Sequence, residues 1–283
     1  MRGTRSARLL AAAAAAALVV GCAGDPMTDS IRPERQAGSG ERAETPKSTM
    51  LVRVAAATAA RGDVAMAASL YRRAHALDPA SFDAALGLAT MLGQLNAANE
   101  AADAYRAALK LRPGDPGALR GLGNTLIVLD QPAQAIPQFD QALKKANDPR
   151  LYNGLGVAHD MLDDYKMAQA YYRTGLELAP GNAELANNLG LSLLLSGDVK
   201  GAVGVLRRLV GNPRATPRHR LNLALALVLA GEDKAAGEVA RIDLDPASAD
   251  AQIAYFETLK AISNPKAMRA AIGAHLSAAA RGG

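Results

Sequence analysis

Apolar residues recur along most of the chain at the spacing of three and four residues that marks one face of a helix. From Ser48 onward the arrangement repeats every 34 residues, and each repeat holds two helix-length apolar runs around a break. Six segments share one register, the third being one residue short: 48–81, 82–115, 116–148, 149–182, 183–216 and 217–250. The pattern predicts six helix-turn-helix units and an all-α fold.

Small and large residues occupy fixed positions within each repeat. Position 8 is Gly or Ala in all six segments, and position 20 is always Ala. Position 24 carries a large side chain in the first five segments: Tyr71, Tyr105, Phe139, Tyr172 and Leu206. Small residues let two helix backbones approach to the short end of the usual 8 to 10 Å range. We expect the large side chain at position 24 to fill the space beside them.

The breaks between the paired runs carry residues that tolerate the left-handed backbone conformation that ends many helices. These residues are Gly62, Asn96, Asp130, Asp163, Gly197 and Gly231. Beyond residue 250, two further apolar-periodic runs flank Asn264 and Pro265. They are expected to form capping helices over 251–283, which cover the open end of a stack of repeats.

A 34-residue helix-turn-helix unit with these residue types at fixed positions resembles the tetratricopeptide repeat (TPR). The resemblance implies a TPR α-solenoid of about six repeats over 48–250. In such a solenoid the first helix of each repeat lines a concave groove, in which an extended segment of a partner protein can bind.

The N-terminal segment has the layout of a secretory signal peptide. Three arginines precede an apolar run of 12 residues, Leu9 to Val20, which is too short to span a bilayer of about 30 Å. The only Cys of the chain, Cys22, follows this run, and Leu18 to Cys22 resembles the bacterial lipobox. The resemblance implies a signal peptide over 1–21, cleavage before Cys22 and lipid attachment to its sulfur; an ordinary secreted protein is the alternative.

Residues 22–47 are expected to form a lipidated Cys and a disordered tether, because Pro, Gly, Ser and charges dominate the segment. Two or three acyl chains would hold the protein on a membrane. Ala23 follows Cys22, where Asp commonly favours retention at the inner membrane in proteobacterial lipoproteins. The expected location is therefore the bacterial outer membrane, facing the periplasm.

Composition narrows the classes of function. One Cys excludes a disulfide framework, and the formal charge of +5 falls to +2 once Arg2, Arg5 and Arg8 are removed with the signal peptide. This balance indicates no nucleic-acid partner. The four histidines are scattered, and we find no pattern for a metal, a cofactor or catalysis, so neither an enzyme nor a small-molecule substrate is expected. His159 with Asp160, Asp163 and Asp164 is interpreted as a hydrated turn rather than a metal site.

The expected groove is polar over its last four repeats and apolar over its first two. Asn offers both a donor and an acceptor, so a row of Asn side chains could bind a peptide backbone; Asn at position 6 is also frequent in TPRs generally. The first two repeats present mainly Val52, Ala56 and Leu86. The candidate partner-binding residues are Arg120, Asn124, Arg150, Asn153, Asn187, Asn188, Arg218 and Asn222.

Several stretches also resemble TadD, the TPR lipoprotein family of the tight-adherence (Tad, or Flp) pilus assembly system. They are Leu151 to Ala158, Ala170 to Arg173, Asn187 to Ser192 and Thr216 to Ala224. The resemblance implies a pilotin-like assembly factor whose partners are the secretin or other Tad components. The alternative is a TPR lipoprotein for outer-membrane protein assembly, polysaccharide export or cell-wall synthesis.

Overall fold

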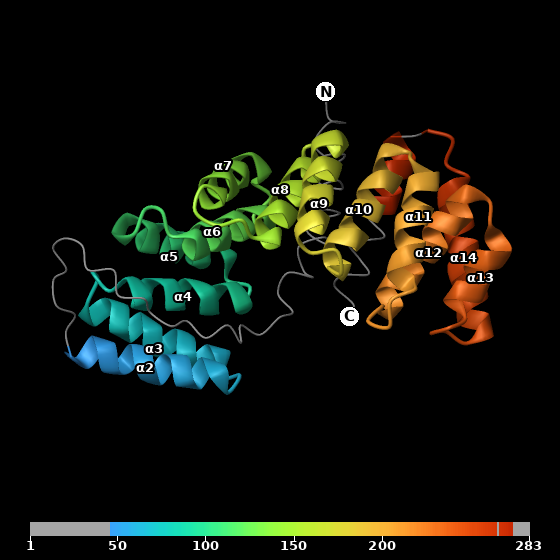
Figure 1. Cartoon of the computed structure of the whole chain (residues 1–283). Helices are drawn as coiled ribbons and strands as arrows, with labels where there is room; N and C mark the ends of the chain where they lie inside the picture. The colour runs from blue at the N-terminus through green and yellow to red at the C-terminus, as the bar shows by residue number, and fades with distance from the viewer. Residues whose placement is uncertain (1–45, 265, 274–283) are drawn as a thin grey trace, which may run out of the picture. The chain divides into compact units, whose positions relative to one another are not determined.

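The computed structural model describes residues 46–264 and 266–273, and every regular element in these ranges is a helix (Figure 1). The all-α prediction is confirmed. The helices are α2 (Pro46–Ala60), α3 (Val64–Leu77), α4 (Phe82–Gln94), α5 (Ala98–Leu111), α6 (Pro116–Val128), α7 (Pro132–Leu143), α8 (Pro149–Met161), α9 (Tyr165–Leu178), α10 (Ala183–Ser196), α11 (Val199–Val210), α12 (Pro217–Ala230), α13 (Asp233–Ala240) and α14 (Pro246–Lys260).

Each predicted repeat corresponds to one pair of consecutive helices, from α2 with α3 to α12 with α13. The chain divides between Asn147 and Asp148 into two compact units. In the described residues the N-terminal unit contains α2 to α7, and the C-terminal unit contains α8 to α14 followed by helical residues 266–273.

The turns inside the helix pairs are closed by the residues that the sequence indicated. Asn96, Asp130 and Asp163 have positive φ values of 57°, 58° and 60°, and Gly62, Gly197 and Gly231 have 85°, 92° and 80°. A residue in the left-handed conformation ends the first helix and reverses the direction of the chain, so the second helix can pack against the first. The turn prediction is confirmed in all six pairs.

The large residue at position 24 packs against the small residue at position 8 of the same repeat. A Cβ atom on Gly123 would lie 2.6 Å from the Phe139 ring, and one on Gly190 would lie 2.6 Å from Leu206. The Gly156 backbone is equally close to the Tyr172 ring. Phe139, Tyr172 and Leu206 are fully buried, so these contacts lie at the centre of these three helix pairs, as expected. Tyr71 and Tyr105 lie instead against Gly87 and Gly121 of the following repeat.

The boundaries differ from the sequence prediction at three places. Pro46 and Lys47, expected in the tether, are the first residues of α2. In the sixth repeat the second helix, α13, has only 8 residues, and α14 begins at Pro246, so the boundary expected at residue 250 falls within α14. The N-cap of α14 explains this early start, because Asp245 accepts hydrogen bonds from the backbone N–H groups of Ala247 and Ser248.

Candidate protein-binding surfaces

The first helices of the N-terminal unit present two rows of side chains, one residue from each helix. α2 and α4 lie side by side, as do α4 and α6. Position 5 of the repeat supplies one row and position 9 the other. We call these six residues the open face: Val52, Leu86, Arg120, Ala56, Thr90 and Asn124.

None of the six side chains on the open face is buried. Ala56 is exposed and the other five are half-buried. Thr90 donates its hydroxyl to the Leu86 carbonyl at 2.9 Å, so the donor of this side chain is already used within α4. The face therefore combines apolar surface on α2 and α4 with the guanidinium of Arg120 and the amide of Asn124 on α6.

The corresponding rows in the C-terminal unit are buried at five of their six positions, and the sixth residue, Leu221, is half-buried. Asn153 and Asn187 at position 5 are 2% and 5% exposed, and Val157, Leu191 and Leu225 at position 9 are fully buried. Helix α10 is buried on nearly every side. The same repeat positions thus form an open surface in one unit and an interior in the other.

A chain of three side-chain hydrogen bonds, which we call the asparagine ladder, crosses α12, α10 and α8. Asn222 Nδ2 donates to Asn187 Oδ1 at 2.7 Å, and Asn187 Nδ2 donates to Asn188 Oδ1 at 3.3 Å. Asn188 Nδ2 donates to Asn153 Oδ1 at 2.9 Å. All four side chains are at most 5% exposed, so the ladder satisfies amides that would otherwise be costly to bury.

These four residues are therefore not the exposed row of amides that the sequence indicated. The sequence indicated Asn residues that recur at the repeat spacing, but it did not indicate that their side chains are buried. The structure gives them a clear structural role, which is to join three first helices of the C-terminal unit. Their contact with a partner stays a prediction.

The remaining candidate residues lie at the ends of the first helices or on α6. Arg150, at the start of α8, is exposed and pairs with Asp148 at 2.9 Å. Arg218, at the start of α12, is half-buried, and its pKa is lowered by burial while the charge of Glu184 opposes that shift. Arg120 and Asn124 lie on the open face, in the other unit. The eight predicted residues are therefore divided between the two units, with two in the N-terminal unit and six in the C-terminal unit.

A buried carboxyl group, which the sequence analysis did not assign to any function, lies on α8, the helix that also carries Asn153 of the asparagine ladder. Asp160 on α8 accepts a hydrogen bond from the Ser192 hydroxyl of α10 at 2.6 Å and from the Tyr172 hydroxyl of α9 at 2.9 Å. Burial raises the pKa of Asp160 to about 7; the two hydroxyl groups oppose the shift and the charge of Asp163 adds to it. The signal in the sequence was a carboxylate four residues after Gly156, on the same face of α8.

The His159 region does not form a metal centre in the described part of the chain. The His159 imidazole lies 3.3 Å from a carboxylate oxygen of Asp164 and packs on the Tyr171 ring. Among the described residues, no three His, Cys, Asp or Glu side chains are grouped so that they could bind a metal ion. The interpretation of this segment as a hydrated turn agrees with the positive φ of Asp163 but is wrong for Asp160, which lies within α8 and is 5% exposed.

The predicted signal peptide, the lipid attachment site Cys22 and all but the last two residues of the tether lie outside the described residues. Within the described ranges, no helix has both the length and the apolar character needed to cross a membrane.

Family models described as tetratricopeptide repeat match most of the described chain. One model matches residues 55–116 and 189–249, a second matches 94–156 and a third matches 149–182. Together the matches extend over 55–182 and 189–249, which is more than half of the 283 residues.

Cellulose synthase operon protein C of Pseudomonas fluorescens is 34% identical over 151 residues. The match includes 50% of this chain but only 12% of that protein. The chain therefore corresponds to a small part of this curated relative.

The similar solved structures include those of PilW and PilF. PilW, whose structure is described as that of a widely conserved type IV pilus biogenesis factor, is 22% identical with a TM-score of 0.62, over 68% of this chain and 90% of that chain. PilF of Pseudomonas aeruginosa is 20% identical with a TM-score of 0.59, over 75% of this chain and 92% of that chain. At these identities the likeness establishes the fold alone.

Proposed function

Because the chain belongs to the tetratricopeptide repeat family and has an all-α solenoid fold, we propose that it is a scaffold that binds protein partners during assembly of a Tad/Flp type pilus. In this proposal the protein is a lipoprotein, anchored through Cys22 to the periplasmic side of the bacterial outer membrane.

The open face of the N-terminal unit is the observation that carries the binding function. Its position-5 and position-9 side chains come from three neighbouring first helices, and none of them is buried. Val52, Ala56 and Leu86 offer apolar contact, while Arg120 and Asn124 offer directional hydrogen bonds. A mixture of this kind suits an extended or helical protein segment, because apolar contact supplies affinity and polar groups fix its register.

The pilus assignment depends on the TadD resemblance, and the fold shared with PilW and PilF supports it. The lipid anchor depends on the lipobox-like stretch before Cys22.

Deletion of the gene tests the pilus role, and point variants test the anchor and the face. The deletion strain is expected to lose surface pili, measured by electron microscopy, and wild-type protein should restore them.

Cys22→Ser should leave an uncleaved or mislocalised precursor. Leu86→Asp with Asn124→Ala should restore export of the protein but not piliation. Normal piliation in the deletion strain would exclude the pilus role and leave the scaffold fold unchanged.

A second candidate function is a scaffold in polysaccharide export, because of the similarity to cellulose synthase operon protein C. This role was among the alternatives indicated by the sequence. The two proposals differ in the phenotype of the same deletion strain. Loss of secreted polysaccharide with intact pili would support the second function and exclude the first.

A further inference from the structure

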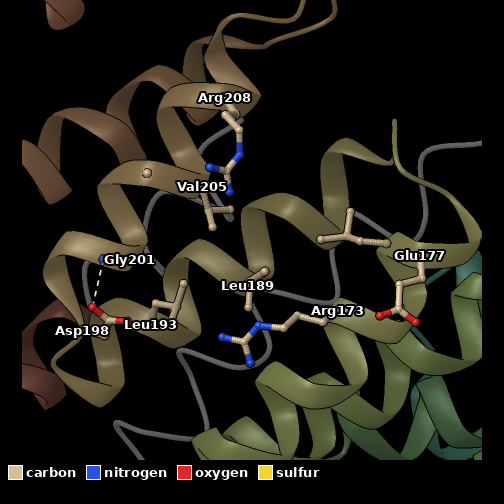
Figure 2. A pocket seen from close by; sticks show the side chains of 10 residues that line it. Arg173, Glu177, Leu189, Leu193, Asp198, Gly201, Val205 and Arg208 are labelled. Atoms are coloured by element: carbon tan, nitrogen blue, oxygen red, sulfur yellow. Dashed lines mark hydrogen bonds between the residues drawn. The ribbon is translucent and has the colours of Figure 1, made fainter.

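A pocket of about 610 Å³ lies on the C-terminal unit between the second helices α9 and α11, with the first helix α10 at its base (Figure 2). Leu189 and Leu193 of α10 form an apolar floor and are 5% and 3% exposed. We call this pocket the second-helix groove. Its lining consists of Arg173, Leu176, Glu177, Leu189, Leu193, Asp198, Gly201, Gly204, Val205 and Arg208.

The second-helix groove contains an arginine that lacks the ion pair made by its counterparts in other repeats. Position 25 is Arg in five repeats, and four of these pair with a carboxylate: Arg72 with Glu100 at 3.1 Å, Arg106 with Asp103 at 2.9 Å, Arg207 with Glu232 at 2.7 Å and Arg241 with Asp250 at 2.6 Å. The exception is Arg173, and no described residue forms an ion pair or a hydrogen bond with its side chain.

The reason lies in the facing helix. Glu100, the partner of Arg72, occupies position 19 of the following repeat. At the same position after Arg173 stands Gly201, which has no side chain to offer. Arg207 pairs instead with Glu232, at position 16 of the following repeat. The residue at that position after Arg173 is Asp198, whose carboxylate accepts the backbone N–H of Gly201 at 2.9 Å and so caps α11.

Gly204 widens the groove without serving the packing of the unit. A Cβ at Gly204 would have no described atom within 4 Å, and a glycine inside a helix lowers stability relative to alanine. Internal contacts therefore do not explain this glycine. The open space above it borders Arg173 and Arg208, neither of which pairs with a described residue.

We propose that the second-helix groove binds an amphipathic segment of a partner protein that carries an Asp or Glu beside its apolar residues. The apolar side chains would contact Leu189 and Leu193, and the carboxylate would take the place at Arg173 that Glu100 takes at Arg72. Glu177, on the same side of the groove as Arg173 (Figure 2), would repel a carboxylate placed one turn further along and so fix the register of the segment. This surface is separate from the open face and uses other helices.

The probe for this proposal is a short synthetic helical peptide with leucines four residues apart and one adjacent glutamate. Its control is the same peptide with glutamine in place of the glutamate. We expect the full chain to bind the glutamate peptide about tenfold more tightly, by fluorescence anisotropy, because an ion pair sheltered by apolar surface contributes about that factor.

Two variants locate the binding. Arg173→Gln should remove the tenfold difference between the peptides, whereas Arg72→Gln, at the same repeat position, should retain it. Gly204→Leu should abolish binding of both peptides by filling the groove, while circular dichroism shows an unchanged helix content. The matched variant Gly93→Leu, at another helical glycine with open space above it, should leave binding unchanged.

Equal affinity for the two peptides would overturn the proposal, as would unchanged binding to the Gly204→Leu variant. Self-association that Gly204→Leu abolishes would also overturn it, because the occupant would then be a second copy of this chain. Neither result bears on the open face, which Leu86→Asp tests independently.

Discussion

The two units of this chain place different residues at the same repeat positions, and those positions differ in burial. In the N-terminal unit positions 5 and 9 of the first helices carry Val, Leu, Arg, Ala, Thr and Asn, and none is buried. In the C-terminal unit five of the six are buried, and the two Asn residues at position 5 belong to the asparagine ladder. A polar residue at position 5 or 9 can therefore bind a partner protein or join neighbouring repeats, and the burial of its side chain distinguishes the two roles.

The two units also differ in the interactions that join their helices. The N-terminal unit relies on large rings placed against small residues, such as Tyr105 against Gly121 and Phe139 against Gly123. The C-terminal unit has the same kind of contact, and adds the asparagine ladder and the buried Asp160. The predictions below test whether the added polar groups make the C-terminal unit sensitive to changes that the N-terminal unit tolerates.

The largest expected effect is a pH dependence that originates from Asp160. Its pKa rises from 3.8 in the unfolded chain to about 7 in the folded one, so the folded state holds a proton that the unfolded state releases between these values. The free energy of unfolding should therefore fall as pH rises from about 4 to about 7, by up to roughly 4 kcal/mol.

Urea unfolding at several pH values, compared between wild type and Asp160→Asn, isolates this contribution from that of other titrating groups. The difference in stability between the two proteins should shift in favour of Asp160→Asn as pH rises. A difference that is constant with pH would show that Asp160 keeps its ordinary pKa in the folded state.

Gly156→Ala is expected to destabilise the C-terminal unit by about 3 kcal/mol, because the added methyl group overlaps the Tyr172 ring and displaces the hydroxyl that binds Asp160. Gly204→Ala is the matched control and should increase stability by up to about 1 kcal/mol, since its methyl group meets open space. Urea midpoints measure both. Equal effects of the two substitutions would contradict the packing described for position 8.

Asn188→Ala is expected to cost about 2 kcal/mol, because it removes an acceptor from Asn187 and a donor from Asn153 within the interior. Asn124→Ala, on the open face, should change the unfolding free energy by less than about 0.5 kcal/mol. Should Asn188→Ala unfold at the wild-type urea concentration, the asparagine ladder would not be a structural element.

The smallest expected effect belongs to a surface ion pair of the N-terminal unit. Arg72 and Glu100 have exposed side chains, and such pairs contribute at most about 1 kcal/mol. Arg72→Gln should shift the thermal midpoint only slightly, and the shift should shrink further in high salt. A large loss of stability would mean that ion pairs between second helices hold this unit together.

The sequence was sufficient to predict the fold because the relevant signals are local. The six turn residues, and the contacts between positions 8 and 24 at Gly123, Gly156 and Gly190, each involve residues within one helix pair, and they appear in the structure. The shortening of α13 was not predicted, because it follows from capping at Asp245 and not from a change in apolar period.

The binding surface was less predictable. Asn124 and Asn153 are the same residue type on equivalent helices, yet one is half-buried and the other 2% exposed. Burial depends on the three-dimensional arrangement of several repeats. The residue type at one repeat position does not reveal this arrangement. The second-helix groove was also missed, since it is lined by residues of three helices that are far apart in the repeat pattern, such as Arg173, Leu189 and Gly204.

Site-specific photo-crosslinking in living cells tests the central claim most directly. The photoreactive amino acid benzoylphenylalanine would replace Leu86 on the open face in one strain and Leu191, in the interior of the C-terminal unit, in another. We expect Leu86 to give a crosslink to a protein of the pilus assembly machinery and Leu191 to give none. A crosslink to that machinery from Leu191, with none from Leu86, would contradict the assignment of the open face as the partner-binding surface.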